Sequence, residues 1–325
     1  MTKLAVVGAT GVVGNKMLEM LENYGIGYDE VVLFSSKRSS GKEIELNGET
    51  LVVQELTDES TDGGFDYVVM SAGGSISEHY APLFEKHGAI VIDNSSQWRM
   101  HEDIDLIVPE INEPKLDRKI IANPNCSTIQ SVVALKPLQD KFGLKRVHYA
   151  TYQAVSGSGS GGIRDLEDGA KGEEPTTYPH PIHNNVLPHI DVFLENGYTK
   201  EEQKMIDETK KILQDDALEV TATCVRVPVM DSHSVQMNVT LDKEATVEEV
   251  RDAFRGFSHI VLMDNPENNE YPMPLDAAGR PEVFVGRIRK DPTLPNTFHV
   301  WCVSDNLLKG AAQNTVQILQ TLIDE

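Results

Sequence analysis

The segment with the clearest chemical potential is Asn123-Pro124-Asn125-Cys126-Ser127-Thr128. Cys126 is one of three cysteines in the 325-residue chain and follows a predicted strand, Ile120–Ala122. Pro124 prevents a helix from starting earlier and apolar residues at helical spacing follow, so Cys126 is predicted at or near a helix N-terminus. Unpaired backbone N–H groups and the helix dipole favour a thiolate there. Cys126 is therefore a candidate nucleophile, the alternative being a small buried hydrophobic residue.

A second segment, Leu4–Gly14, has the pattern of a strand, a glycine-rich turn and a helix. Gly8, Gly11 and Gly14 would allow a tight turn, close backbone approach to a pyrophosphate, and packing of the helix on the strand. The helix N-terminus would favour the phosphate charge. The segment predicts a dinucleotide site, and the alternative is a tight turn without a ligand.

The end of the second predicted strand favours NADP over NAD. NAD-specific sites usually place Asp or Glu there to hold the ribose hydroxyls. The segment Leu33–Ser40 has no acid, and it places Lys37 and Arg38 among hydroxyl groups that suit a 2′-phosphate. A polar surface loop is the alternative. Ser71–Gly74 follows the third strand and is expected to flank the cofactor.

The first third of the chain alternates short apolar runs with amphipathic helical patterns. Predicted strands are Leu4–Val7, Val31–Phe34, Tyr67–Met70, Ile90–Asp93 and Ile120–Ala122, and predicted helices are Val12–Leu21 and Ile76–Lys86. This alternation is typical of an α/β fold with a doubly wound, Rossmann-type parallel sheet. A hairpin, Glu43–Leu46 and Leu51–Gln54 around Asn47-Gly48, interrupts it.

From Lys145 the predicted strands are longer, which indicates an α+β domain with a mixed or antiparallel sheet. They are Arg146–Val155, Val220–Val227, Val235–Asp242, Val283–Arg289 and Phe298–Ser304, with helices at Glu201–Leu213 and Val247–Phe257. The run Ser156–Gly162 reads as a linker, although a strand precedes it and a helical pattern follows. The last helix, Leu307–Leu322, is expected to return to the first domain. We therefore predict an NADP-binding domain of residues 1–127 and 305–325, and an inserted catalytic and dimerisation domain of residues 128–304.

Composition excludes several classes of partner. The formal charge of −22 disfavours nucleic acid. No run of eighteen apolar residues exists, so no membrane span is expected. The N-terminus lacks a signal-peptide pattern, and the widely spaced cysteines (Cys126, Cys224, Cys302) argue for a reducing cytoplasm and against a zinc or disulfide framework. Cys224 and Cys302 are expected to be buried and inert. Three histidines in a proline-rich loop (His180, His183, His189) lack regular metal-ligand spacing, so no metal site is predicted.

Taken together, these segments resemble the aspartate-β-semialdehyde dehydrogenases, over essentially the whole length. The resemblance rests on Ser95-Ser96-x-Trp98-Arg99, Pro109-Glu110-Ile111-Asn112, Asn123-Pro124-Asn125-Cys126 and Cys224-Val-Arg226-Val-Pro-Val-x-x-x-His233. The related acyl-phosphate reductase of arginine biosynthesis is expected to have Gly before the cysteine. Asn125 at that position favours the aspartyl branch.

The resemblance implies that NADPH reduces L-4-aspartyl phosphate to L-aspartate 4-semialdehyde, with release of phosphate, through a thioester on Cys126. His233 would be the general acid/base. The implied substrate-binding residues are Arg226 for the α-carboxylate, Arg99 and Lys204 for the phosphate, Glu201 for the ammonium, and Asn125 and Gln153 for the acyl intermediate. The implied cofactor contacts are Gly8, Thr10, Gly11, Val12, Val13, Ser35, Arg38, Ser39, Ser71, Ala72, Gly73, Ser156, Gly157 and Asn306. A cytoplasmic homodimer, paired through the sheet of the second domain, is expected.

Other interpretations stay open at this point. Glu201 and Lys204 are three residues apart on one helix and would form a solvated surface ion pair in the usual case. A sister enzyme such as N-acetyl-glutamyl-phosphate reductase or malonyl-CoA reductase would use the same thioester chemistry. A non-catalytic dinucleotide-binding regulator would share the fold but would have no need for Cys126 together with His233.

Overall fold

The computed structural model describes residues 1–324, and Glu325, the end of the predicted first domain, lies outside them. The chain divides into an N-terminal unit, Met1–Pro124 with Ala311–Glu325, and an inserted unit, Asn125–Gly310. Within residues 1–324, no helix combines the length and the apolar character needed to cross a bilayer.

The N-terminal unit is built on a seven-stranded, fully parallel sheet in the order β5-β2-β1-β6-β7-β9-β8. Its strands are β1 (Lys3–Val7), β2 (Glu30–Ser35), β5 (Gln54–Glu55), β6 (Tyr67–Met70), β7 (Ile90–Asp93), β8 (Asp105–Leu106) and β9 (Ile120–Ala122). The order reverses at β1, because β2 lies on one side of it and β6 on the other. Such a switch point is where doubly wound folds bind ligands, and the Rossmann-type prediction is confirmed.

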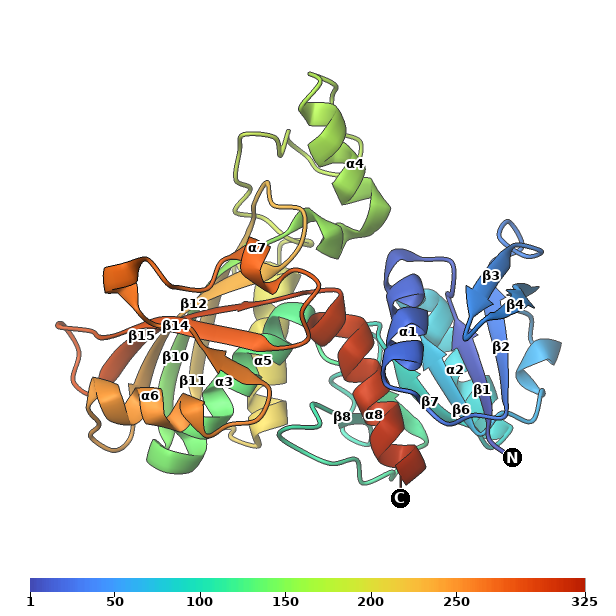
Figure 1. Cartoon of the computed structure of the whole chain (residues 1–325), viewed down its shortest axis with the longest axis horizontal. Coiled ribbons are helices and arrows are strands. Elements are labelled where there is room, and N and C mark those ends of the chain that lie inside the picture. The colour runs from blue at the N-terminus through green and yellow to red at the C-terminus, as the bar shows by residue number, and fades with distance from the viewer. Residues whose placement is uncertain (325) are drawn as a thin grey trace. The chain divides into compact units, whose positions relative to one another are not determined.

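Three long helices belong to this unit: α1 (Val12–Asn23), α2 (Gly74–Lys86) and α8 (Gln313–Asp324), with a short 3₁₀ turn η1 (Glu59–Thr61). The helix α8 packs on α1 and β7, and Figure 1 shows α8 beside α1. The predicted return of the last helix to the first domain is confirmed. That helix differs from the prediction at its start, because Leu308–Ala312 (η4) forms a π-helical turn before α8 begins.

The predicted hairpin forms between β3 (Glu43–Leu46) and β4 (Glu49–Val52). Asn47 (φ 52°) and Gly48 (φ 78°) are both left-handed, as a two-residue hairpin turn of this kind requires. The second strand of the hairpin was predicted at Leu51–Gln54, but it begins two residues earlier, at Glu49. It ends at Val52 because Gln54–Glu55 leaves the hairpin and pairs with β2 of the main sheet.

The inserted unit is built on a six-stranded sheet in the order β11-β10-β12-β15-β14-β13. The sheet is mixed, which is one of the two predicted alternatives, and β13 was not predicted. Its strands are β10 (Leu144–Gln153), β11 (Glu219–Arg226), β12 (His233–Leu241), β13 (Ile260–Leu262), β14 (Val283–Lys290) and β15 (Thr297–Ser304). The pairs β10–β11 and β13–β14 are parallel, and the others are antiparallel. The predicted strand Arg146–Val155 stops at Gln153, because Val155–Ser158 turns into a 3₁₀ helix (η2).

The helices of the inserted unit are α3 (Cys126–Phe142), α4 (Gly159–Gly169), α5 (Lys200–Leu213), α6 (Val247–Arg255) and α7 (Pro274–Ala277), with a 3₁₀ turn η3 (Pro266–Asn268). The helices α3, α5 and α6 pack on the sheet, α3 against its central strands and α5 against β11. Twelve of the residues of α3 are buried, so this helix forms the centre of the core. The Ser/Gly run is ordered structure rather than a linker, because η2 and the start of α4 absorb it (Figure 1).

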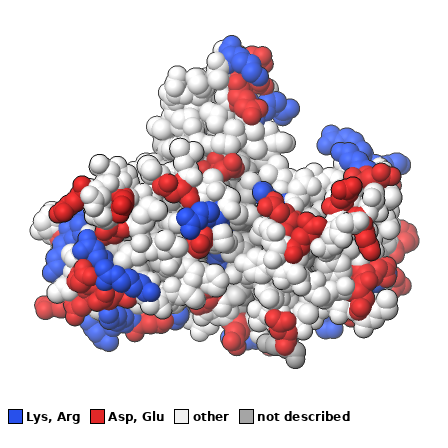
Figure 2. All heavy atoms as spheres, in the orientation of Figure 1, with Lys and Arg blue, Asp and Glu red and all other residues white. Residues whose placement is uncertain are grey.

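On the face that Figure 2 shows, the negative charge is not gathered in one patch. Figure 2 shows acidic side chains in several separate groups on this face, with Lys and Arg interspersed.

Candidate active site

Cys126 is the first residue of α3, as predicted. Asn125 caps the helix, because its Oδ1 accepts hydrogen bonds from the backbone N–H groups of Ser127 (3.0 Å) and Thr128 (3.2 Å). Asn is among the strongest N-cap residues, and such a cap stabilises a helix by about 1 kcal/mol. Cys126 is partly exposed. The helix start is thus fixed while its cysteine remains accessible.

Cys126 packs closely on Gly310 in the π-helical turn. A Cβ atom at position 310 would lie 3.0 Å from the Cβ of Cys126 and 3.3 Å from its Cα. Any larger residue would therefore press on the backbone that carries the sulfur. π-helical turns are frequent at functional sites, and no pattern in the sequence indicated this one.

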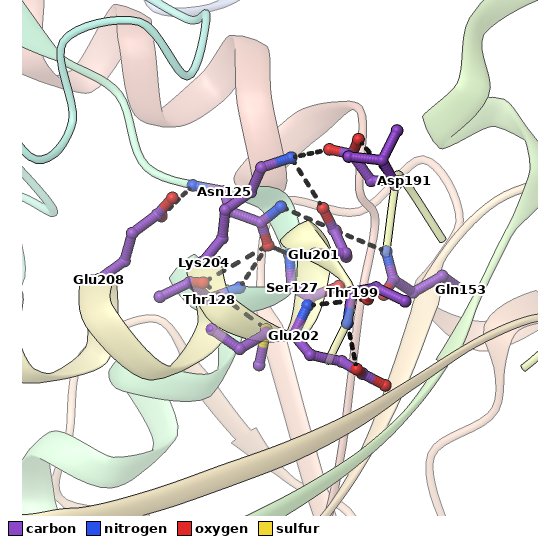
Figure 3. Close-up of polar contacts among 12 residues, drawn as sticks. Asn125, Ser127, Thr128, Gln153, Asp191, Thr199, Glu201, Glu202, Lys204 and Glu208 are labelled. Carbon is purple, nitrogen blue, oxygen red and sulfur yellow. Dashed lines mark hydrogen bonds and ion pairs between the residues drawn. The ribbon is translucent and has the colours of Figure 1, made fainter. Parts of the chain in front are cut away.

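Two carboxylates of α5 hold Asn125 in place. The Asn125 Nδ2 donates to Glu201 Oε1 (2.8 Å), and the Asn125 backbone N–H donates to Glu208 Oε2 (2.6 Å). Gln153 Nε2, at the end of β10, donates to the same Glu201 oxygen (3.1 Å). Figure 3 shows these side chains converging from α3, α5 and β10. The structure therefore brings together three residues that were predicted separately.

Glu201 and Lys204 form an ion pair of 3.1 Å, but it is not the solvated surface pair of the alternative reading. Glu201 is only 5% exposed. Burial opposes its ionisation, but Lys204 and the hydrogen bonds from Asn125 and Gln153 outweigh that effect and lower the pKa of Glu201 to about 2. Lys204 also contacts Asp191 (2.8 Å), so its ammonium lies between two carboxylates (Figure 3).

His233 begins β12, and its side chain is fully buried. Its Nδ1 accepts a hydrogen bond from the backbone N–H of Ala154 (2.9 Å). A backbone N–H can only donate, so Nδ1 carries no proton and the neutral ring holds its proton on Nε2. Within residues 1–324, Nε2 has no hydrogen-bond partner. A buried donor without a partner costs stability, so this Nε2–H is available to a ligand oxygen.

The surroundings keep the His233 ring neutral. Burial, together with the charge of Arg226, lowers the pKa of His233 to about 3. The ring is therefore a neutral hydrogen-bond donor near pH 7. It can donate a hydrogen bond from Nε2 to an oxygen that becomes negative, and it stabilises that charge without losing its proton.

Arg226 ends β11 and is 5% exposed. Its Nη1 donates to the carbonyl of Ala154 (2.7 Å), and its guanidinium lies 5.9 Å from the ring centre of Tyr178. Within the described chain, its Nε has no partner. Arg226 lines a cavity of about 270 Å³ with Ser158, Thr177, Tyr178, Pro179, His189, Ile190 and Asp191. A guanidinium with an unused donor in a cavity can bind a carboxylate.

Gly157 brings the histidine and the arginine to one point. A Cβ atom at this position would lie 3.2 Å from His233 Nε2 and 3.2 Å from Arg226 Nη1. The glycine therefore leaves open the space beside both groups. This close approach explains why glycine stands here.

Asn306 ties this turn to the backbone before the histidine. Its Oδ1 accepts from the Ser232 N–H (2.8 Å), and its Nδ2 donates to Ser156 Oγ (3.0 Å). Ser232 is left-handed (φ 76°), an unfavourable conformation for a residue with a side chain. The observed contacts of Asn306 thus hold a strained residue next to His233, and its predicted cofactor contact stays a prediction.

In the N-terminal unit, the glycine-rich turn after β1 has no room for side chains. Gly8 is left-handed (φ 83°), and a Cβ there would lie 2.1 Å from the carbonyl oxygen of Ser71. A Cβ on Gly14 would lie 2.0 Å from the carbonyl oxygen of Gly8. Gly11 is the N-cap of α1 and provides no side-chain cap. The first N–H groups of α1 are thus left for another acceptor, and an anion fits there.

A cleft of about 290 Å³ lies beside this turn, lined by Val7, Gly8, Thr10, Gly11, Ser35, Ser36, Leu56, Ser71, Ala72, Ile76 and Tyr80. Thr10 Oγ1 and Ser35 Oγ are 2.8 Å apart across it. Val12 and Val13 begin α1 and are partly buried, and Gly73 is the N-cap of α2. Backbone amides for a pyrophosphate and hydroxyls for a ribose are the donors that a dinucleotide requires, so the residues fit one. Arg38 is exposed and Ser39 is buried, and neither lines the cleft.

Arg99 belongs to the N-terminal unit and is 8% exposed. Its Nε donates to the carbonyl of Asn123 (2.9 Å) and its Nη2 to the carbonyl of Asn94 (3.0 Å). Two backbone carbonyls thus fix the direction of the guanidinium. The other substrate residues predicted from the resemblance lie in the inserted unit.

The other two cysteines are packed away from solvent. Cys224 and Cys302 lie in β11 and β15 and are fully buried, as predicted, and burial raises the pKa of Cys302 to about 12. His189 stacks on Phe193 with ring centres 4.3 Å apart. Residues 1–324 contain no cluster of three His, Cys, Asp or Glu side chains that could hold a metal ion.

Four residues that the sequence analysis did not select contact this site: Asp191, Glu208, Ser232 and Gly310. Each acts on a selected residue from a distant part of the chain or from irregular backbone. Helical spacing places Glu208 on the same face of α5 as Glu201 and Lys204 and could have identified it. No periodicity marks the other three, because their partners are set by tertiary packing.

Comparison with known proteins agrees with this geometry. Residues 3–119 match the semialdehyde dehydrogenase NAD-binding domain, and residues 135–309 match the semialdehyde dehydrogenase dimerisation domain. The aspartate-semialdehyde dehydrogenase of Aquifex aeolicus is 51% identical over 99% of this chain and 98% of its own length. That of Bacillus subtilis is 48% identical over 98% of this chain and 96% of its own.

Solved structures give the same result. Aspartate-semialdehyde dehydrogenase II of Vibrio cholerae, complexed with ASA, superposes with a TM-score of 0.96 at 40% identity and covers 100% of this chain and 99% of its own. The enzyme of Candida albicans with NADP superposes with a TM-score of 0.77 at 27% identity over 99% of this chain and 98% of its own. Because it matches these relatives over nearly its full length, the chain belongs to the aspartate-semialdehyde dehydrogenases, oxidoreductases that act on an aldehyde group.

Proposed function

We propose that this chain is a cytoplasmic, NADP-dependent aspartate-semialdehyde dehydrogenase that uses a thioester on Cys126. It would convert L-4-aspartyl phosphate to L-aspartate 4-semialdehyde with release of phosphate, a step in the biosynthesis of lysine, diaminopimelate, threonine and methionine. The observation that carries the proposal is the convergence of capped Cys126, Asn125, Gln153 and Glu201, with buried His233 in the same unit.

The first step is acyl transfer. The Cys126 sulfur attacks the acyl carbon of the substrate, the C–O bond to the phosphate breaks, and phosphate leaves with the electron pair. The Asn125 cap fixes the backbone that carries the sulfur. Because Glu201 holds both Asn125 and Gln153, these amides are oriented before the substrate arrives, which reduces the cost of reorganisation.

The second step is reduction of the thioester. When bound, the reduced nicotinamide supplies a hydride to the acyl carbon. The thioester oxygen takes up negative charge, and His233 stabilises it through its Nε2 proton before the C–S bond breaks and the thiolate leaves. In the reverse direction, the same Nε2–H would stabilise the oxygen that becomes negative when the Cys126 thiolate adds to the aldehyde carbon.

Residues for the substrate and the cofactor follow from the charges that each must meet. Arg226 would bind the α-carboxylate through its unused Nε, Arg99 and Lys204 would bind the phosphate, and Glu201 would attract the ammonium. Gly8, Gly11 and the start of α1 would hold the pyrophosphate. Ser35, Arg38 and Ser39 would receive the ribose and its 2′-phosphate, which is the basis for proposing NADP. Ser71, Ala72, Gly73, Ser156 and Gly157 are proposed as further cofactor contacts.

We further propose a homodimer through the face of the second sheet that carries Tyr152, Gln236 and Trp301. These side chains line a hollow of about 350 Å³ with Tyr271, Pro272, Met273, Pro274, Arg287 and Arg289. Tyr152 is 41% exposed, and aromatic and arginine side chains are enriched in interfaces. Sedimentation should give a dimer mass, and Tyr152→Glu should shift it toward the monomer. A monomeric wild type would contradict the proposal.

One assay tests the proposed reaction. The purified protein, aspartate semialdehyde and NADP should produce reduced nicotinamide, which absorbs at about 340 nm, only when phosphate is added. Arsenate, as a phosphate analogue, should substitute. The assignment would be overturned if phosphate produced no signal with aspartate semialdehyde. It would also be overturned if coenzyme A, as the acceptor of the acyl group, supported the same rate as phosphate.

A further inference from the structure

Gln130 is a fully buried amide that neither the sequence pattern nor the resemblance selected. It lies in α3, four residues after Cys126, and the whole segment from Ser127 to Leu135 is buried with it. Burying an amide costs free energy unless its polar atoms find partners. An apolar residue would fill the same space without that cost, so the contacts of this amide need an explanation.

The amide nitrogen of Gln130 joins α3 to the strands β12 and β15. Its Nε2 donates to the backbone carbonyl of His233 (3.1 Å) and, at a longer distance, to that of Cys302 (3.4 Å). Two carbonyl oxygens facing this end of the amide identify it as the NH2 group, since Oε1 there would repel both. Within residues 1–324, Oε1 has no hydrogen-bond partner, and the contact of Nε2 with the Cys302 sulfur (3.7 Å) is weak. The bond to His233 is therefore the main polar interaction of this side chain.

Gln130 and Cys126 lie on the same face of α3. Residues four apart stand one above the other on a helix, and their side chains lean toward its N-terminus. The Gln130 side chain therefore reaches back over the turn that begins with Cys126. Its bond to His233, across 103 residues of sequence, joins the helix of the nucleophile to the residue that carries the imidazole.

The other anchors of the histidine come from elsewhere in the inserted unit. The Ala154 N–H holds the ring at Nδ1, and Asn306 holds the N–H of Ser232. Neither bond sets the distance from the ring to α3, because Ala154 follows β10 and Asn306 follows β15. Ser232 is left-handed (φ 76°), so the backbone before His233 is strained and would move if an anchor beside it were lost.

We propose that Gln130 is a positioning residue that sets the distance between the Cys126 sulfur and the His233 imidazole. The inference rests on the proposed function, in which both groups act on one acyl carbonyl. The sulfur holds the carbon and the Nε2–H of His233 meets the oxygen, so their separation must stay fixed while the hydride arrives. A displacement of about 1 Å can cost on the order of a hundredfold in rate. Gln130 acts through its neighbours, since it lines neither the cavity around Arg226 nor the cleft beside the glycine-rich turn.

The test compares Gln130→Met with Gln139→Met. Met keeps the length and the unbranched shape of Gln but cannot donate a hydrogen bond. Gln139 is the matched control, because it lies on the same helix and its Nε2 also donates to a backbone carbonyl, that of Leu213 (3.0 Å). Each variant loses one bond between an amide of α3 and a carbonyl, and only the first bond reaches His233.

We expect Gln130→Met to lower kcat with aspartate semialdehyde, NADP and phosphate by about ten- to a hundredfold. The three KM values should change by less than about threefold, because no group that binds a substrate is removed. The rate of Cys126 alkylation by iodoacetamide, measured as a function of pH, should stay within about twofold of the wild type, because Asn125 still caps the helix. Gln139→Met should keep the kcat of the wild type.

Other outcomes would overturn the proposal. An unchanged kcat in Gln130→Met would show that the bond does not position His233. Equal losses of kcat in both variants, or alkylation that slows in proportion to kcat, would show a general disturbance of α3.

If Gln130→Met does not fold, Gln130→Glu takes its place. A buried carboxyl group beside two carbonyl oxygens keeps its proton at low pH and can donate to His233. Its kcat relative to the wild type should therefore fall as the pH rises, and a relative kcat that does not vary with pH would contradict the proposal. A wild type without phosphate-dependent activity would instead refute the proposed reaction.

Discussion

The two units build their candidate sites in different ways. In the N-terminal unit, the dinucleotide turn lies within one short segment, and backbone atoms make it: Gly8 approaches the carbonyl of Ser71, and Gly14 approaches that of Gly8. In the inserted unit, buried side chains make the site. Asn125 meets Glu201 across 76 residues, and the Ala154 N–H meets His233 across 79. A backbone site tolerates changes of charge but not of volume, whereas a site of buried charges should respond to both.

The largest expected effect is that of Cys126→Ser. Turnover should fall by at least about 10⁴-fold, because the hydroxyl is a far weaker nucleophile than a thiolate. Binding of NADPH, measured by its fluorescence, should change by less than about twofold. Cys302→Ala, at a buried cysteine, should retain activity. Activity in Cys126→Ser would refute the nucleophile assignment.

Arg226→Lys should raise the KM for the semialdehyde by about ten- to a hundredfold. A lysine keeps the charge but loses the planar fork, which a point charge cannot replace. The KM for NADP should not follow, because Arg226 belongs to the other kind of site. An unchanged KM for the semialdehyde would contradict the predicted role.

Glu201→Gln should change how stability depends on pH. The pKa of Glu201 in the folded chain, about 2, lies below its ordinary value of 4.5. Its ionised form therefore stabilises the fold above pH 4.5, and this contribution is lost as the pH falls from about 4.5 to about 2. Urea unfolding should show the variant less stable at pH 7, on the order of 2 kcal/mol. The difference from the wild type should shrink by pH 3. A difference that stays constant with pH would count against the ionised pair.

Gly8→Ala tests the backbone site. The new methyl group would collide with the carbonyl of Ser71, and φ at this position is 83°. We expect the Kd for NADP to rise about tenfold with a loss of about 1–2 kcal/mol in stability. The rate of Cys126 alkylation should not change. If alkylation slows as much as cofactor binding weakens, the contrast between the units fails.

The smallest effect is expected for Arg38→Ala. Arg38 is exposed, so its attraction to a 2′-phosphate is screened by water and salt. The ratio of kcat/KM with NADP to that with NAD should fall by about tenfold at low salt and by less at high salt. An unaltered ratio at every salt concentration would exclude Arg38 as the selecting residue.

The elements that are marked by a regular pattern of apolar residues in the sequence were predictable. Tyr67–Met70, Ile90–Asp93 and Ile120–Ala122 form strands with the predicted bounds, because short apolar runs between turn residues leave a parallel strand few alternatives. The helix start at Cys126 was predictable for the same reason, since Pro124 and Asn125 are local signals.

The parts that depend on packing were not predictable. The π-helical turn Leu308–Ala312 interrupts a regular helical pattern, and within it Gly310 packs closely on Cys126. From the sequence alone, Glu201 and Lys204 look like a surface ion pair. Their contacts with Asn125, Gln153 and Asp191 make them part of a buried network, and those contacts depend on tertiary packing. Irregular backbone at Asp191 and Ser232 gave no periodic signal at all.

The contact between Cys126 and Gly310 also has a mechanical meaning. Both residues belong to the inserted unit, so the contact is internal to it. The length of the π-helical turn therefore fixes where the sulfur stands. An insertion or deletion in that turn would displace the nucleophile while the Asn125 cap of α3 stays intact.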